Sequence, residues 1–184
     1  SPSTAAMKYA LGVAATTCSY QDWYGTDLVI FFGANPANDQ PVTAKYLHEA
    51  KKLGTKIVMV NPYREPGMDR YWVPSSADSA LFGTDLMDYW FPVSTGGDIA
   101  FLGGVLKILI ENNWVDEAFI RNQTAGFDAL KLAVGDWPLA MLEERSGLNR
   151  DAMQEFAELI YGAKNAVLVW SMGITQHAFG EDNA

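Results

Sequence analysis

The stretch Asp27-Leu-Val-Ile-Phe-Phe-Gly33-Ala-Asn35-Pro36 decides the fold of this chain. Its apolar run ends at Gly33, and a polar loop over residues 33–40 leads into a predicted helix, Pro41–Lys52. A second apolar run, residues 56–60, ends in the same way at Asn61-Pro62. Apolar runs of this length without alternation indicate strands buried on both faces, as in a parallel sheet. Two such strands joined by a helix predict a right-handed βαβ unit.

The remaining sequence predicts further helices and two further strands around that unit. Residues 1–12 begin and end like a helix, with Pro2 in the first turn and Gly12 as the stop. We predict the other helices over residues 99–112, 115–121, 127–134, 137–145 and 149–161, and strands over residues 88–93 and 166–170. Residues 74–87 are predicted to form an excursion from the sheet. The predicted fold class is α/β, with three layers: a mostly parallel, Rossmann-like sheet and helices on both faces.

The length and charge of the chain narrow the class of protein. With 184 residues and 49% hydrophobic composition, the chain suits a single α/β domain over residues 1–184. Its formal net charge of -9 argues against nucleic acid as a partner, because that role needs a surface rich in Lys and Arg. An anionic cofactor remains open, since backbone N–H groups at helix N-termini hold phosphate. The apolar runs are strand-sized, so no membrane span is expected.

The chain offers few residues for metal or nucleophilic chemistry. Its one cysteine, Cys18, cannot build an iron–sulfur or Cys-rich metal site by itself. His48 and His177 have no second ligand at metal-binding spacing, so we interpret both as packing or surface residues. The sequence contains no HExxH, CxxC or Walker motif and no specific nucleophile–base pair. We therefore predict neither a catalytic residue nor a metal ligand within these residues.

Three strand ends carry the residues that suit ligand binding. They are residues 33–35, 61–63 and 172–176. Because the carboxyl ends of parallel strands share one edge of a sheet, we expect these segments to converge there. Gly33 permits a sharp turn and the close approach of a ligand, and the amides of Asn35 and Asn61 suit a base edge or a ribose. Gly96-Gly97-Asp98, just before a helix, is a further candidate for holding an anion.

Each of these features also has a simpler structural interpretation. Asn-Pro after a strand is ordinary turn chemistry, and Asp98 is explained as the N-cap of its helix. Arg64 and Arg70 could grip a phosphate. Pairing with the neighbouring acids Glu65 and Asp69 is the favoured interpretation on a surface. An aromatic cluster forms either core packing or an interaction patch, and comprises Trp72, Tyr89, Trp90 and Phe91.

Six segments of the chain follow one another in a specific order. They are Ser1-Pro2-Ser3; residues 27–36 with Pro41; residues 54–62; Gly97-Asp-Ile-Ala-Phe-Leu102; Phe119-Ile120 with Thr124-Ala-Gly-Phe-Asp128; and Met172-Gly-Ile-Thr-Gln176. Their order and spacing resemble the molybdopterin oxidoreductase family, specifically its formate-dehydrogenase-like catalytic subunits. The resemblance covers nearly the whole chain. It implies an α/β domain that holds one of the two molybdopterin guanine dinucleotides that chelate molybdenum or tungsten in such enzymes.

The resemblance also assigns residues of this chain to the cofactor. It implies that Gly33, Asn35 and Pro36 border the dinucleotide. Further residues are implied to approach it: Gly97, Asp98, Met172, Gly173 and Gln176. Asn61 stands where the family often has an acidic residue that reads the guanine. This departure matters because an amide lacks the charge that strengthens a paired hydrogen bond to the base.

The resemblance implies that the catalytic group lies outside these residues. The family's metal ligand, a cysteine or selenocysteine usually followed by histidine, precedes the segment that matches Ser1-Pro2-Ser3. An iron–sulfur domain would lie further upstream. Both ends of the sequence indicate cuts through a longer polypeptide, so we expect the remaining domains of that polypeptide and an electron-transfer partner as partners. We expect a cytoplasmic enzyme whose isolated fragment is inactive.

Two functions of other classes stay open at this point. The chain could be a nucleotide-binding or regulatory module without redox chemistry, which predicts tight binding of a simple nucleotide. It could instead be a protein-interaction module that uses the aromatic cluster, which predicts self-association without a ligand. The substrate does not follow from the residues, since formate is suggested only by analogy at the level of the family.

Overall fold

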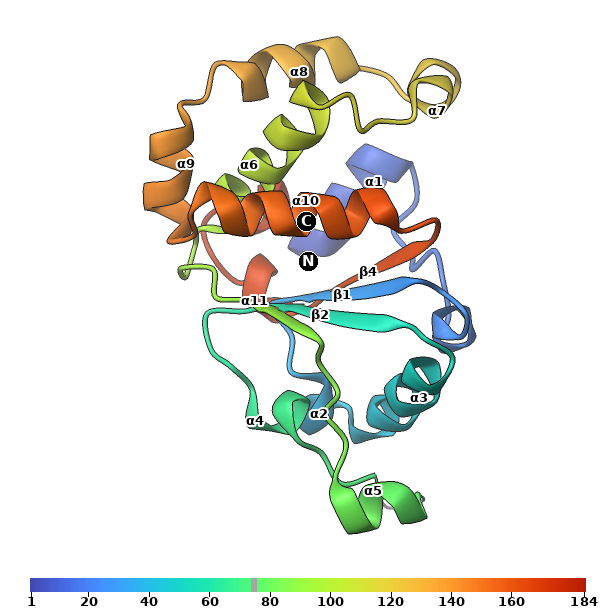
Figure 1. Cartoon of the computed structure of the whole chain (residues 1–184). Helices are drawn as coiled ribbons and strands as arrows, with labels where there is room; N and C mark the ends of the chain where they lie inside the picture. Colours follow the sequence, from blue (N-terminus) through green and yellow to red (C-terminus); the bar gives the residue numbers. More distant parts are fainter. Residues whose placement is uncertain (74–75) are drawn as a thin grey trace. The chain divides into compact units, whose positions relative to one another are not determined.

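The computed structural model describes residues 1–73 and 76–184 of the chain. The chain divides into two compact units, one made of Ser1–Pro92 with Ala163–Ala184 and the other of Val93–Gly162. The first unit contains the sheet, and the second is built of helices (Figure 1). That residues 1–184 act as one cofactor-binding domain of a longer chain stays a prediction.

A parallel sheet forms the centre of the first unit. Its strands are β1 (Leu28–Phe32), β2 (Lys56–Val60), β3 (Tyr89–Phe91) and β4 (Ala166–Trp170). Their order across the sheet is β3-β2-β1-β4, and every neighbouring pair is parallel. The α/β prediction is confirmed, and the predicted βαβ unit consists of β1, the helix α3 (Pro41–Lys52) and β2. Because the strands are parallel, their carboxyl ends lie at one edge of the sheet.

Helices lie on both sides of this sheet. Strand β1 is buried along its whole length, as its unbroken apolar run predicts. Val169 of β4 packs against the core cluster on the α3 side, so the next residue, Trp170, points to the opposite face. There the indole Nε1 of Trp170 donates to Ser3 Oγ of α1 (Pro2–Leu11) over 3.0 Å. Figure 1 accordingly shows α1 and α3 on opposite sides of the strands.

Helix α3 begins and ends where the sequence predicts, but part of its buried face is different. Pro41 opens the helix, and Gly54 follows its end with φ 96°. By its spacing, Val42 falls on one apolar stripe of the helix with Tyr46, Leu47 and Ala50, which predicts that it is buried. In the structure Val42 is instead 69% exposed. Thr43 is buried instead, because its hydroxyl donates to the carbonyl of Gln40 at 2.7 Å and carries no unpaired polar group into the core.

Short helical turns occupy the loops of the first unit. They are η1 (Tyr20–Trp23), α2 (Pro36–Asp39), α4 (Pro66–Asp69), α5 (Ala77–Phe82), α11 (Met172–Thr175) and α12 (Gly180–Asn183). The predicted loop over residues 33–40 therefore contains α2, because Asn35 Oδ1 accepts from the N–H of Asn38 and caps the turn. Residues 74 and 75 of the predicted excursion lie outside the described residues, and α5 lies in the remainder.

The second unit packs its helices around α6. The helices are α6 (Asp98–Glu111), α7 (Glu117–Gln123), α8 (Phe127–Gly135), α9 (Leu139–Ser146) and α10 (Arg150–Gly162). Helix α6 packs against α8, α9 and α10. The rings of Phe101 and Phe156 meet edge to face with their centroids 5.0 Å apart. The sequence predicts each of these helices, with ends that differ by a few residues. In the ranges that the structure describes, no helix combines the length and hydropathy required to cross a membrane.

The buried face of α6 is not the one that its large aliphatic residues predict. The helical spacing of the large aliphatic residues predicts a buried stripe of Ile99, Leu102, Leu106, Leu109 and Ile110. In the structure these five residues are only half-buried. Phe101 and Val105 are buried instead. Small residues set this face, because a Cβ on Gly103 would lie 2.6 Å from the ring of Trp137. Where the segment between α8 and α9 approaches α6 this closely, a glycine marks the contact and the leucines do not.

Candidate functional site

Three strand ends meet at one edge of the sheet. The N–H of Gly33, just after β1, donates to the carbonyl of Val60, the last residue of β2, at 3.1 Å. On the other side of β1, the N–H of Gly173 donates to the carbonyl of Gly33, also at 3.1 Å. These bonds join the loops that follow β1, β2 and β4. The fold thus brings together residues 33–35, 61–63 and 172–176, and we call these three loops the strand-end rim.

Gly33 and Gly173 are held against each other by their backbones. Gly33 has φ 56°, and a Cβ there would lie 2.7 Å from the N atom of Ile174. A Cβ on Gly173 would lie 2.5 Å from the carbonyl oxygen of Gly33. Contacts this short with backbone atoms admit no side chain at either position. The structure therefore gives the two glycines a packing role, and close approach of a ligand to them stays a prediction.

Asn35 has two roles in the loop after β1. Its Oδ1 caps α2 through the N–H of Asn38 at 3.3 Å, and its Nδ2 donates to Glu65 Oε2 at 2.6 Å. Pro36 is the buried first residue of α2. The bond to Glu65 links the loop after β1 to the loop after β2. Sequence reasoning missed this role of Glu65, because it predicted an arginine partner for that carboxylate.

The carboxyl group of Glu65 lies in an environment that disfavours its charge. Partial burial raises the pKa of Glu65, and the negative charge of Asp39 raises it further. The hydrogen bond from Asn35 acts in the opposite direction and lowers this pKa. Glu65 is half-buried, so the carboxylate stays in contact with solvent. A hydrogen-bond donor from a ligand would therefore stabilise its charged form.

Asn61 is a buried connector between loops. It is 5% exposed, and its Nδ2 donates to the carbonyl of Ala34 at 2.8 Å. Its backbone N–H donates to the carbonyl of Phe91 at 3.2 Å, and its carbonyl accepts from Trp90 Nε1 at 3.0 Å. These bonds tie the ends of β1, β2 and β3 together. The amide donor that the sequence offers for a base edge is thus already used within the protein.

The arginines of the loop after β2 divide between an acid and a carbonyl. Arg64 makes two hydrogen bonds to Asp69, from Nε at 2.9 Å and from Nη2 at 2.5 Å, which confirms the predicted ion pair. Its guanidinium also lies 5.6 Å from the ring centre of Trp90. The hydrogen bond to Asp69 raises the pKa of Arg64. Arg70 donates to the carbonyl of Phe82 at 2.9 Å, so pairing with an acid was the wrong prediction for this residue.

The loop after β4 presents side chains to solvent. Met172 is 60% exposed, and its sulfur accepts from Gln176 Nε2 at 3.2 Å. Gln176 and Gly173 are exposed as well. The predicted site residues of this loop therefore lie at the rim with their surfaces open.

Both histidines contact polar partners within the protein. His48 is buried, with its Nε2 3.2 Å from Ser76 Oγ and its Nδ1 3.4 Å from Thr84 Oγ1. His177 Nε2 lies 2.7 Å from the Nδ2 of Asn183. These contacts agree with the predicted packing role. The Oδ1 of Asn183 is buried and has no hydrogen-bond partner among the residues that the structure describes. No three His, Cys, Asp or Glu residues in the described ranges gather as metal ligands would.

Gly97 and Asp98 belong to the second unit, at the start of α6. Gly97 is the N-cap residue of this helix, so the prediction that Asp98 caps it was wrong. A Cβ on Gly97 would lie 2.6 Å from the carbonyl oxygen of Arg145, which explains the glycine by packing against the end of α9. Asp98 is 6% exposed in the first turn, where its charge complements the helix dipole. Contact of either residue with a cofactor stays a prediction.

The strand-end rim offers backbone donors to an anion. In the described part of the chain, the N–H groups of Ala34 and Asn35 donate to no other group. Both residues are half-buried. Consecutive N–H groups at the end of a strand form a recurrent phosphate-binding arrangement. Binding of the phosphates of a dinucleotide by these two N–H groups stays a prediction.

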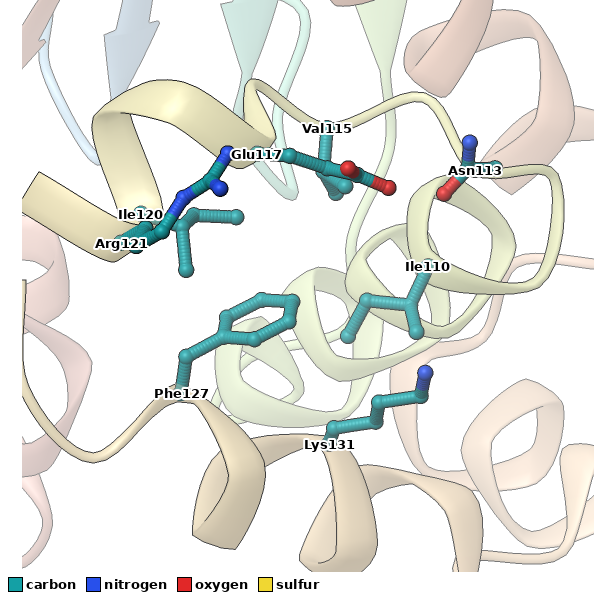
Figure 2. A pocket seen from close by; sticks show the side chains of 8 residues that line it. All are labelled: Ile110, Asn113, Val115, Glu117, Ile120, Arg121, Phe127 and Lys131. Carbon is teal, nitrogen blue, oxygen red and sulfur yellow. The ribbon is translucent and has the colours of Figure 1, made fainter.

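One cavity of about 300 Å³ lies in the second unit (Figure 2). Its lining residues are Ile110, Asn113, Val115, Glu117, Ile120, Arg121, Phe127 and Lys131. Figure 2 shows Arg121 and Lys131 on opposite sides of the Phe127 ring. The charged side chains are exposed, so water screens them and their arrangement specifies no ligand. None of the predicted cofactor residues lines this cavity.

Comparison with known proteins gives a family and several relatives. A family model described as molybdopterin oxidoreductase matches residues 3–184. The chain is 31% identical to Protein YdeP of Escherichia coli strain K12 over 194 residues, which cover 99% of this chain and 26% of that protein. It is 27% identical to formate dehydrogenase H of the same strain over 175 residues, 95% of this chain and 22% of that enzyme.

A solved structure shares the fold. Acetylene hydratase from Pelobacter acetylenicus superposes with a TM-score of 0.72 at 21% identity, covering 94% of this chain and 21% of that one. The chain thus spans about a quarter of the length of the relatives it matches. The description of this family names both its activity, oxidoreductase, and its cofactor, molybdopterin. Because the family model covers nearly every residue, the chain belongs to the molybdopterin oxidoreductase family.

Proposed function

We propose that this chain holds one molybdopterin guanine dinucleotide in a formate-dehydrogenase-like oxidoreductase. One observation carries the proposal: the loops after β1 and β4 meet at Gly33 and Gly173, beside the end of β2, in a chain of this family. Ligands of parallel α/β sheets bind at this edge. The similarity to formate dehydrogenase H supports the finer assignment.

Each part of the rim would contact a different part of the dinucleotide. The N–H groups of Ala34 and Asn35 would hold its phosphates, beside Gly33 and Pro36. The exposed loop after β4 would contribute Met172, Gly173 and Gln176. Asn61 would hold the rim in place through the hydrogen bond from its Nδ2 to the carbonyl of Ala34. Further contacts are proposed for Gly97 and Asp98 of the second unit.

The bound cofactor would supply a molybdenum or tungsten centre for two-electron redox chemistry. In the whole protein we propose a metal ligand and an iron–sulfur domain in segments upstream of Ser1. The remaining domains and an electron-transfer partner would complete a cytoplasmic enzyme. Formate is the substrate that the similarity to formate dehydrogenase H favours.

Nucleotide and metal analysis of the full-length protein tests this function. We expect molybdenum or tungsten in the purified protein, together with GMP released by acid hydrolysis of the cofactor. The variant Gln176→Ala removes an exposed rim side chain and should lower the GMP content without unfolding the protein. The variant Gln123→Ala, at the exposed end of α7, is the matched control. Metal without GMP would overturn the dinucleotide assignment, and a simple nucleotide without metal would favour the non-redox module.

A further inference from the structure

Strand β4 forms one edge of the sheet, and in the described part of the chain it pairs with β1 alone. The N–H of Ser171 donates to the carbonyl of Phe32, so it points toward β1. Because backbone groups alternate in direction along a strand, those of Ala166, Leu168 and Trp170 point away from β1. These outward N–H and C=O groups make no hydrogen bond to any residue that the structure describes. The outer side of β4 can therefore pair with a further strand.

The sequence of β4 is typical of a strand in the interior of a sheet. Its five residues, Ala166-Val-Leu-Val-Trp170, are all apolar, and its pairing with β1 is continuous. Edge strands commonly carry a charge, a proline or a bulge that prevents pairing with other chains, and β4 contains none of these. An unbroken apolar run is instead typical of a parallel strand that is buried on both faces. Even so, none of the five residues is buried.

Leu168 shows which face of β4 lacks a cover. It pairs in register with Ile30 of β1, so both side chains point to the same face of the sheet. Ile30 is 0% exposed, whereas Leu168 is 51% exposed. Val167 and Val169 pack on the α3 side, so Leu168 points to the face on which α1 lies. The layer that covers this face over β1 therefore does not extend over β4.

The handedness of parallel crossovers places a connecting helix on this same face. Helix α3 joins β1 to β2 on one face of the sheet, and β4 lies on the other side of β1 from β2 (Figure 1). A crossover from β4 to a strand beyond it runs in the opposite direction across the sheet. To stay right-handed, it must carry its helix on the opposite face, where α1 lies. Such a helix would cover Leu168.

The described residues after β4 do not contain such a crossover. Helices α11 and α12 have four residues each, which is about 6 Å of helix. The five residues of β4 extend over about 17 Å, and the connection must return over that length. Helix α12 nevertheless packs against α1, so the chain already runs on the face of Leu168. The relatives that the chain matches are about four times as long, which leaves ample length for the remaining connection.

We propose that residues following Ala184 in the full-length protein supply a helix that covers Leu168 and a further strand that pairs in parallel with β4. The open edge, the apolar sequence and the exposed face of β4 then have one common explanation. The strand β4 becomes an interior strand, as its sequence favours. This inference does not depend on the ligand of the strand-end rim, so the proposed function can fail while this pairing holds.

Amide hydrogen exchange in the full-length protein, resolved to single residues by mass spectrometry, tests the pairing. The inward N–H groups of Val167 and Val169 bond to β1 and provide the internal control. The outward N–H groups of Leu168 and Trp170 report on the open edge. We expect the outward pair to exchange within about tenfold of the inward pair, because β4 would be hydrogen-bonded on both sides. A larger excess in the rate of the outward pair would show an open edge and overturn the proposal.

Photocrosslinking of the purified full-length protein identifies the occupant. A photoreactive benzophenone amino acid replaces Leu168, and mass spectrometry identifies the peptide to which it couples. We expect a peptide that follows Ala184 in the same molecule. The same replacement at Val42, which is 69% exposed on α3, is the control and should not couple to that peptide. A crosslinked dimer would show that a second copy covers β4, and a peptide that precedes Ser1 would show a different segment. Either result would overturn the proposal.

Discussion

The strand-end rim of the first unit and the start of α6 in the second unit use glycine in the same way. In both places the sequence predicts a glycine beside a ligand, and the structure shows protein backbone where a Cβ would lie. They differ in where that backbone comes from. Gly33 meets the loop after a neighbouring parallel strand, whereas Gly97 meets the end of α9. A close approach at the rim follows from sheet topology, and one at α6 follows only from tertiary packing.

The largest effect is expected for Gly33→Ala at the rim. The new Cβ would overlap the backbone of Gly173 and Ile174, and alanine would also be strained at φ 56°. Overpacking and left-handed strain together should cost about 3–5 kcal/mol in the free energy of unfolding. Urea denaturation followed by circular dichroism measures this loss. Gly162→Ala, at a helix end with open space around it, should be neutral or slightly stabilising. Equal stability of the two variants would contradict the packing role of Gly33.

Gly97→Ala tests the start of α6 and should lower stability less than Gly33→Ala does. Its Cβ would overlap the Arg145 carbonyl oxygen and the Cα of Ser146, without the added strain of a positive φ. We expect a loss of about 2 kcal/mol in the free energy of unfolding. The same urea titration measures it. A loss greater than that of Gly33→Ala would reverse the order of the two regions.

Asn61→Ala removes a side-chain bond of the rim while leaving its glycines intact. The carbonyl of Ala34 loses its donor, but this residue is half-buried and water can replace the bond. We therefore expect a loss of about 1 kcal/mol, below the cost of a fully buried unpaired group. Thermal unfolding of the variant and the wild type measures the difference. A loss as large as that of Gly33→Ala would mean that the side chain, rather than the backbone contact, holds the loops together.

Asp27 lies at the end of β1 opposite the rim, and its substitution is expected to have the smallest effect on stability. Its carboxylate accepts from the N–H groups of Lys164 and Asn165, and these bonds lower the pKa of Asp27. A lowered pKa in the folded state adds stability above the unfolded value of about 3.9, and this stability is lost as the pH falls through the folded value. Unfolding measured between pH 7 and pH 3 should show a shallower acid loss for Asp27→Asn than for the wild type. Identical profiles would show that these bonds add no pH-dependent stability.

The sheet and its rim could be predicted from the sequence because each depends on short-range signals. Unbroken apolar runs gave β1 and β2, and parallel pairing then places their ends together. Glycine and proline marked the ends of α3. These signals can be read from the amino-acid sequence alone, since they reflect local backbone chemistry and strand burial.

Side-chain partners across loops could not be predicted in the same way. The bond between Asn35 and Glu65 joins residues whose nearest neighbours in sequence offered other partners. The buried face of α6 was mispredicted because close packing at Gly103 outweighed the large aliphatic residues beside it. Both cases depend on which segments the fold brings together. For the candidate site, the sequence therefore identifies the place better than it identifies the contacts.

The position of β4 in the chain has a consequence for biosynthesis. β1 lies inside the sheet, yet one of its two neighbours is encoded after the entire second unit. The ribosome synthesises β1, β2 and β3 before β4. The nascent sheet therefore has an open edge along β1 until translation reaches residue 166. Exposed edges of apolar strands recruit other chains. While residues 93–162 are being translated, the open edge of β1 is therefore free to pair with strands of other chains.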